Sequence, residues 1–263
     1  GRVSLLLVVL AVLGYGFWWV DKLGRSNQGP IDLTGPGIPV DQISFRTDGV
    51  LTDRWFKNWF GPLRGRTLMD LDIERIHRDL LAEDQISYAQ VTRDFPGTLR
   101  VELKERQPIL VLRLGSKDGQ VRDWLVSADG TLYLGTEYPL SMLSLLPSLS
   151  VDPSLVRPRK EGTGYEKLAG IPRVAPLLEL VRREYPGIYR DWQIVSYERP
   201  HEDDPGAHVS VRSGKVKKLR FSPENYSVQM KRLHYLLLEP DIRRKPVIES
   251  IDLSHGRSVF AKI

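Results

Sequence analysis

Apolar and charged residues alternate strictly from Leu99 to Lys104, and this pattern constrains the fold more than any other stretch of the sequence. A period of two is typical of a strand with one buried and one solvated face. Pro96-Gly97 precedes the strand and predicts a tight turn, because proline presets φ and glycine accepts a positive φ. Pro108 lacks an N–H, so it marks an edge, a bulge or the start of a second strand before the apolar run Ile109–Leu112. The stretch therefore predicts a joint between two packed units.

The N-terminal run Val3–Val20 contains eighteen residues without a charge. At ~1.5 Å per residue, a helix of this length is ~27 Å long, about the thickness of the hydrocarbon core of a membrane. Trp18 and Trp19 end the run, where aromatic residues favour the membrane interface. A cleaved signal peptide is the alternative, but no Ala-x-Ala site follows and the bulky end disfavours cleavage. We expect a transmembrane helix over residues 1–22 and a juxtamembrane linker, rich in Gly and Pro, over residues 23–39.

Composition excludes some classes of site and leaves others open. The 263 residues include no cysteine, which excludes disulfides, thiolate zinc sites and cysteine nucleophiles. The net charge of +5 would suit nucleic acid or anionic lipid, but the charges are scattered and favour an ordinary solvated surface.

A first unit is expected over residues 40–114, with the element order β-α-α-β-β. Thr52 is a candidate N-cap for a helix that carries four aromatic side chains, and Gly61-Pro62 would end it. Asp70 or Asp72 would cap a second helix, whose apolar residues recur at helical spacing. The strands around 87–92 and 99–104 complete this unit.

A second unit is expected over residues 115–263, with more strands than helices. Two hairpins are indicated by turn residues between apolar runs, at 124–134 and 208–221. Helices are expected at Val174–Tyr185 and Tyr226–Leu238, and two strands, Val247–Leu253 and Ser258–Ile263, close the chain. The whole chain is therefore expected to be α+β: an N-terminal transmembrane helix, a small β-α-α-β-β domain, and a β-rich domain with flanking helices.

No catalytic motif occurs in the sequence, and the five histidines are dispersed, so the residues indicate no catalytic site, no metal and no cofactor. The stretch His201–Asp204 would be able to chelate a cation, although a solvated loop is favoured. The densest basic patch lies on the second hairpin without interleaved aromatic residues, which argues against nucleic acid. A solvated strand face is favoured there, and anionic lipid or a cell-wall polymer is the alternative; the patch consists of Lys215, Lys217, Lys218 and Arg220.

The motifs, taken in order, resemble the FtsQ/DivIB family of bacterial cell-division proteins. The resemblance covers essentially the whole chain from the anchor onward, while residues 151–170 have no counterpart. The first unit is similar to the family's POTRA domain (polypeptide transport-associated), so residues 40–114 would be POTRA-like and residues 115–263 the FtsQ-type β domain. The stretches that carry the resemblance are Phe95–Pro108, Asp123–Gly135, Leu146-Pro147, Gln229–Pro240 and Ser250–Ile263.

The resemblance implies a non-enzymatic, bitopic scaffold of the bacterial divisome in the inner membrane. Its N-terminus would be cytoplasmic and its bulk periplasmic or extracytoplasmic, at the division septum. The implied partners are FtsB-like and FtsL-like membrane proteins and, downstream, the FtsW–FtsI synthase; no nucleic acid is implied.

The closing strands are the expected partner-binding site, because an edge strand offers unpaired N–H and C=O groups to which a partner segment can add. The residues expected to line this surface are Ser250, Ile251, Leu253, Ser254, Val259 and Phe260. Those that point inward would be ordinary sheet core. Further contacts are expected on the POTRA-like unit, at Asp48, Gly49, Trp55 and Trp59.

Two other function classes remain open from the sequence. One is a membrane-tethered cell-wall hydrolase, which would need a polar cluster that converges in a concave pocket. The other is a membrane-anchored POTRA-bearing transport or assembly factor, which usually carries repeated POTRA units or the strands of a barrel.

Overall fold

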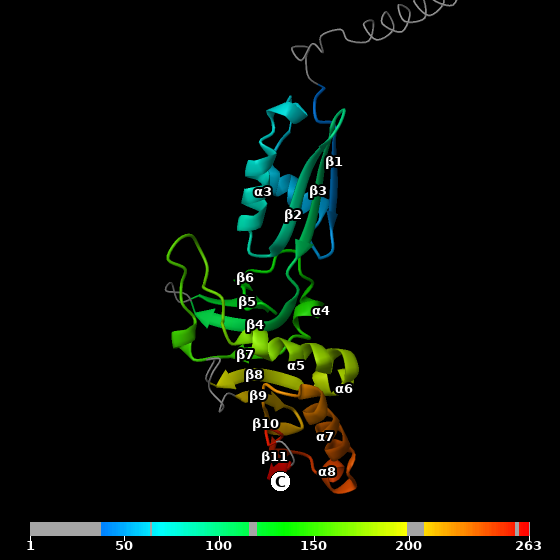
Figure 1. The fold of residues 1–263 in the computed structure, drawn as a ribbon, viewed down its shortest axis with the longest axis vertical. Coiled ribbons are helices and arrows are strands. Elements are labelled where there is room, and N and C mark those ends of the chain that lie inside the picture. The colour runs from blue at the N-terminus through cyan, green and yellow to red at the C-terminus, as the bar shows by residue number, and fades with distance from the viewer. Residues whose placement is uncertain (1–37, 64, 116–119, 199–207, 256–257, 263) are drawn as a thin grey trace, which may run out of the picture.

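The computed structural model describes residues 38–63, 65–115, 120–198, 208–255 and 258–262. Two units are stacked along the long axis of the molecule (Figure 1). The expected transmembrane helix at residues 1–22 and almost all of the expected linker lie outside the described residues. No helix in the described ranges has the length and apolarity needed to cross a membrane.

The first unit has the element order that the sequence predicts. Its three-stranded sheet has the order β1-β3-β2, in which β1 and β3 are parallel and β2 and β3 antiparallel. The Thr52 hydroxyl accepts a hydrogen bond from Trp55 N at 3.2 Å, and Asp72 accepts one from Arg75 N at 2.9 Å, so both expected N-caps are confirmed. The elements are β1 (Gln42–Thr47), α2 (Asp53–Phe60), the 3₁₀ helix η1 (Leu68–Asp70), α3 (Ile73–Ala82), β2 (Ile86–Asp94) and β3 (Thr98–Glu105).

The second unit is built on one nine-stranded sheet of order β12-β11-β10-β9-β8-β7-β4-β5-β6. Both expected hairpins are confirmed, since β5 pairs antiparallel with β6 and β9 with β10. The strands are β4 (Pro108–Gly115), β5 (Val121–Ser127), β6 (Leu132–Tyr133), β7 (Ser148–Ser150), β8 (Trp192–Glu198), β9 (His208–Ser213), β10 (Val216–Phe221), β11 (Ile248–Asp252) and β12 (Phe260–Lys262). The helices are α4 (Leu140–Leu143), η2 (Pro153–Leu155), α5 (Ile171–Glu184), α6 (Pro186–Tyr189), α7 (Tyr226–Leu238) and α8 (Pro240–Arg244).

The expected fold class, α+β with an N-terminal transmembrane helix, is wrong for the described residues. The large sheet is mixed: β4 and β7, β7 and β8, and β10 and β11 are parallel pairs. Parallel neighbours need a crossover connection, and helices supply it here, α5 between β7 and β8 and α7 between β10 and β11. The architecture is therefore mixed α/β, with the helices as crossovers rather than flanking additions.

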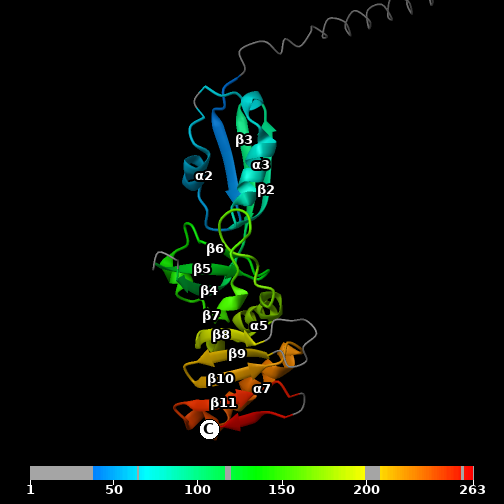
Figure 2. The same cartoon turned by 90° about the vertical axis from the view of Figure 1, so that its left-hand side faces the viewer.

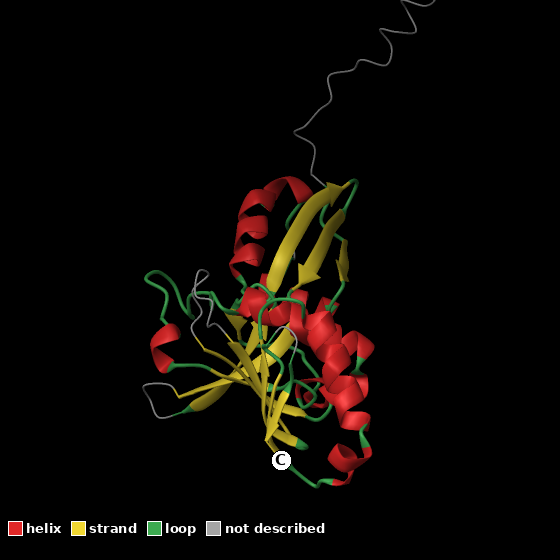
Figure 3. Ribbon diagram, turned by 60° about the horizontal axis from the view of Figure 1, so that its bottom comes forward, coloured by secondary structure: helices red, strands yellow, loops and turns green. Residues whose placement is uncertain are grey.

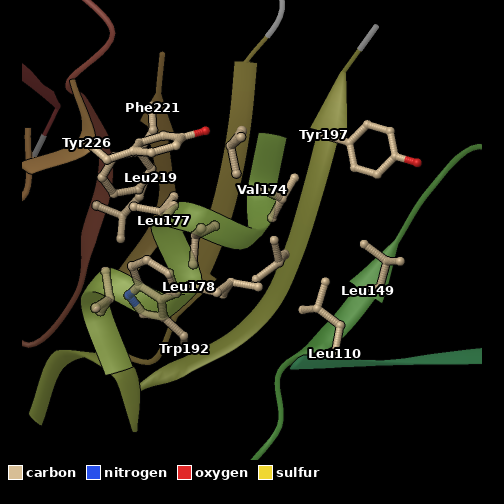
Figure 4. Close-up of a cluster of buried hydrophobic side chains, with 14 of the residues drawn as sticks. Leu110, Leu149, Val174, Leu177, Leu178, Trp192, Tyr197, Leu219, Phe221 and Tyr226 are labelled. Carbon is tan, nitrogen blue, oxygen red and sulfur yellow. The ribbon is translucent and has the colours of Figure 1, made fainter. Parts of the chain in front are cut away.

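Helices α5 and α7 lie along one side of the large sheet (Figures 1 and 3). Leu177 and Leu178 of α5 are buried and face side chains of the sheet such as Trp192 and Leu219 (Figure 4). The Tyr226 hydroxyl at the start of α7 donates a hydrogen bond to Arg173 O of α5 at 2.9 Å. Crossover helices and sheet thus share one apolar core, while the first unit has a separate core of its own.

The chain changes sheets at Arg106-Gln107, between the end of β3 and the start of β4, which is earlier than the boundary expected after residue 114. Pro108 is the first residue of β4, a position where its missing N–H costs little. At the joint, Glu105 is 5% exposed and its carboxylate accepts three hydrogen bonds. The donors are Thr47 Oγ1 at 2.6 Å, Leu51 N at 2.9 Å and Gln85 Nε2 at 2.9 Å.

Gln85 joins this carboxylate to the second unit. Its side chain accepts from Thr136 N at 2.8 Å and donates to Thr136 O at 3.2 Å. The hydroxyls of Tyr133 and Tyr138 donate to Arg106 O at 2.7 and 3.0 Å, and burial raises the pKa of both tyrosines, so they remain donors. Satisfied polar groups in a buried joint fix one relative orientation of the two units.

Candidate functional site

The two edges of the nine-stranded sheet differ in their exposure. Leu132 and Tyr133 of β6 are buried at the edge that meets the first unit. Strand β12, at the opposite edge, is exposed along its whole length and has no second strand beside it among the described residues. Figure 2 shows β11 and the closing strand at the end of the molecule farthest from the first unit. The outer main-chain groups of β12 are therefore open to pairing with another chain.

The register of β11 and β12 determines which side chains share a face. Phe260 lies opposite Asp252 and Lys262 opposite Ser250, while Ala261 lies opposite Ile251. Ile251 belongs to the core that α5 and α7 cover. Because side chains alternate between the two faces of a sheet, Phe260, Lys262, Asp252 and Ser250 lie on the face opposite this core. If a partner strand paired with β12, its side chains on this face would lie next to those of Phe260 and Lys262.

The expected site residues fall into two groups. Ile251 and Leu253 are 0% and 1% exposed and pack in the core, so their side chains are not available at the surface. Val259 also packs against this core and lies before β12, which is shorter than the expected strand Ser258–Ile263. Phe260 is 59% exposed, and Ser250 is half-buried beside it on the same face. These two remain the best candidates from the expected set.

Ser254 has a structural role at the end of β11. Its N–H and hydroxyl donate to Asp252 Oδ1 at 3.0 and 2.6 Å. Partial burial raises the pKa of Asp252, but these hydrogen bonds and the charges of Arg220 and His255 hold it below its ordinary value. Asp252 is therefore a carboxylate at neutral pH and fixes the turn that leads to β12.

His255 and Phe260 form an aromatic pair at the edge, with ring centroids 5.0 Å apart in an edge-to-face arrangement. His255, Asp252 and Lys262 are not among the site residues expected from the sequence. For Asp252 a sequence signal was present: Ser250 and Asp252 alternate with the apolar residues of the same strand, which predicts that both point away from the core. The cross-strand register, which no local pattern gives, was needed to place Lys262 and Phe260 beside them.

The basic hairpin is largely neutralised by partners. Lys217 pairs with Glu249 at 2.9 Å, Lys218 with Glu198 at 3.9 Å and Arg220 with Asp252 at 3.7 Å. The ammonium of Lys215 donates to the carbonyl groups of Arg243 and Lys245 at the end of α8. These pairs favour the solvated-face interpretation of the patch over binding of an anionic polymer.

Asp48 and Gly49, expected as surface contacts of the first unit, are exposed and also support the joint. Asp48 Oδ1 accepts from Glu105 N at 2.8 Å. A Cβ on Gly49 would lie 2.2 Å from the carboxylate carbon of Glu105, so only glycine leaves room for that group. Trp55 and Trp59 are half-buried and stack on each other with ring centroids 6.0 Å apart. Their outer edges remain accessible.

No family model matches this chain, and no curated protein matches it either. In the described part of the chain, no group of three or more histidine and carboxylate side chains is placed to hold a metal ion. The stretch His201–Asp204 lies outside the described residues.

Proposed function

We propose that this chain is a non-enzymatic scaffold of the bacterial divisome, of the FtsQ/DivIB type. It binds FtsB-like and FtsL-like proteins through a partner strand that adds to β12, outside the cytoplasm at the division septum, upstream of the FtsW–FtsI synthase. The observation that carries this proposal is the edge strand β12, which is fully exposed and has no outer neighbour in the part of the chain that the structure describes. Strand addition gives affinity through main-chain hydrogen bonds and specificity through alternate side chains.

The rest of the architecture supports a scaffold. The buried joint around Glu105 holds the two units in one orientation and covers the edge at β6, so β12 is the exposed edge of the large sheet. The edge strand therefore stands at one end of the molecule and the POTRA-like unit at the other (Figure 1). Two separated surfaces on a rigid body can hold two partners at a fixed distance.

The test uses the full chain and the extracytoplasmic segment of the FtsB-like protein from the same organism, titrated by calorimetry. We expect Phe260→Ala to weaken binding at least about tenfold, or about 1.4 kcal/mol, because exposed aromatic side chains at an interface centre are common hot spots. Tyr235→Ala is the matched control, since Tyr235 is 69% exposed on α7. Its affinity should equal that of the wild type.

A pair of proline variants separates main-chain from side-chain effects. Adjacent residues of a strand point their N–H groups in opposite directions, so one of Phe260→Pro and Ala261→Pro removes an outward N–H and the other an inward one. The outward variant should keep the fold by circular dichroism and lose binding. If both variants fold and bind like the wild type, strand addition at β12 is refuted.

A further inference from the structure

A cleft of about 500 Å³ lies between the two units, at the joint, where Gln85, Tyr133 and Thr136 are part of its lining. The first unit contributes the start of α2 and the end of α3, and the second contributes β5, β6 and the loop between η2 and α5. Clefts at domain interfaces, in the range of about 300–1,000 Å³, are common ligand sites. The side chains that line it include Trp55, Glu83, Asp84, Arg122, Trp124 and Thr136.

Two half-buried indoles form walls of the cleft. Trp55, from α2, is stacked on Trp59, and Trp124, from β5, stands edge-to-face against Tyr165 with centroids 4.9 Å apart. Among the described residues, neither the Trp55 nor the Trp124 N–H has a hydrogen-bond acceptor. Each indole therefore offers an apolar surface and a free donor to a ligand.

The charged groups of the cleft cancel. Asp84 forms an ion pair with Arg159 at 2.6 Å, and Glu83 accepts from the indole N–H of Trp59 at 3.0 Å. Arg122 also lines the cleft, so its charge and that of Arg159, which pairs with Asp84 from outside the lining, balance the two carboxylates. The cleft therefore favours a neutral ligand over a strongly charged one.

The loop between η2 and α5 contributes Thr163 and Gly164 to the cleft. Its shape is fixed by the bridge between Pro158 and Tyr165 and by a hydrogen bond from Arg159 Nε to Tyr165 O at 3.0 Å. The ion pair from Arg159 to Asp84 ties it to the end of α3. The loop thus forms one ordered wall of the cleft and brings the side chain of Thr163 to it.

We propose that this cleft binds a neutral oligosaccharide. A sugar presents apolar C–H faces, which suit the indoles of Trp55 and Trp124, and hydroxyls, which suit carboxylates, Arg122 and the threonines. This site is at the opposite end of the large sheet from β12. Its occupancy is therefore independent of the partner binding proposed above.

The test is a ligand-observed NMR titration of the full chain in a detergent without a sugar headgroup, since such a headgroup would compete. The probes are N-acetylchitotetraose and cellotetraose as neutral tetrasaccharides, and tetragalacturonate as an acidic one. We expect saturable binding of at least one neutral probe and at least tenfold weaker binding of the acidic probe.

Three variants locate the binding. Trp124→Ala removes one wall, and Trp55→Ala removes the other but also a partner of Trp59. Thr163→Phe fills the cleft from an exposed loop position without removing an indole, which covers the case in which Trp55→Ala fails to fold. Each folded variant should weaken binding at least tenfold, and Tyr235→Ala should not. The proposal is overturned if neither neutral probe saturates, if the acidic probe binds as well, or if Trp124→Ala and Thr163→Phe bind like the wild type.

Discussion

Glu105 is the residue on which the joint depends. It occupies the inward face of β3, in phase with Leu99, Val101 and Leu103, all of which are buried. A buried carboxylate is costly unless its oxygens are hydrogen-bonded, and here a hydroxyl, a main-chain N–H and a side-chain amide supply the bonds. The alternation indicated the inward position of Glu105, but the sequence predicted only a joint here and gave no hydrogen-bond partner for the carboxylate.

Replacement of Glu105 should separate the loss of a side chain from the loss of a charge. Glu105→Ala leaves Leu51 N without its acceptor and leaves Gln85 Nε2 with Thr136 O as its remaining acceptor, so we expect a loss of about 3 kcal/mol in the free energy of unfolding. Glu105→Gln keeps one acceptor oxygen but turns an amide donor toward Gln85, which cannot flip without losing both bonds to Thr136. We expect roughly half the loss for that variant.

Urea denaturation of the purified chain measures both changes. Glu102→Ala is the matched control, because Glu102 lies on the same strand with its side chain on the opposite face, and it should cost about 0.5 kcal/mol or less. If Glu105→Gln is as destabilising as Glu105→Ala, or if neither exceeds the control, the described role of this carboxylate is wrong.

At the scale of elements, the local patterns gave reliable predictions. Helix α7 spans Tyr226–Leu238 as expected, and Thr52 and Asp72 cap the helices that they were expected to cap. Parallel pairing was not foreseen, because it depends on where a crossover helix returns the chain, and no local period encodes that. The three-residue strand β7 is too short to show a period at all.

Asp129, in the turn between β5 and β6, makes the stability of the fold depend on pH. Asp129 accepts from Ser127 Oγ at 2.5 Å, from Thr131 Oγ1 at 2.9 Å and from Lys167 Nζ at 2.6 Å. Partial burial raises the pKa of Asp129, but these bonds outweigh it and hold the pKa well below its ordinary value. Because the folded-state pKa is the lower one, the folded state binds fewer protons. The stability gained is present above about pH 4 and is lost as the pH falls through the folded-state pKa.

Asp129→Asn should therefore destabilise the chain more at pH 7 than at pH 3. We expect about 1–2 kcal/mol at pH 7, a modest value because the side chain is 45% exposed and partly screened. Urea denaturation at the two pH values measures the difference. Asp123→Asn, which removes a surface pair with Arg113, is the control and should leave the pH dependence close to that of the wild type. An equal loss of stability for Asp129→Asn at both pH values would contradict a lowered pKa of Asp129 in the folded state.

At the scale of the molecule, the first unit covers one edge of the large sheet, and the other edge has no neighbouring strand within the described ranges. The sequence predicted that the closing strands bear the partner site, and this remains a proposal. It did not predict which side chains would reach the surface, because that depends on the register with β11 and on the helices that cover Ile251.

The central claim, that a partner strand adds to β12, is tested most directly by amide hydrogen exchange of the full chain with and without the FtsB-like segment. Exchange should slow at least about tenfold at residues 260–262, since outward N–H groups that are open become hydrogen-bonded. Exchange at β2 and at the covered edge β6 should not change. Unchanged exchange at residues 260–262 in a saturated complex, with protection at β2 or α2 instead, would show that the partner binds elsewhere and that β12 is not the docking edge.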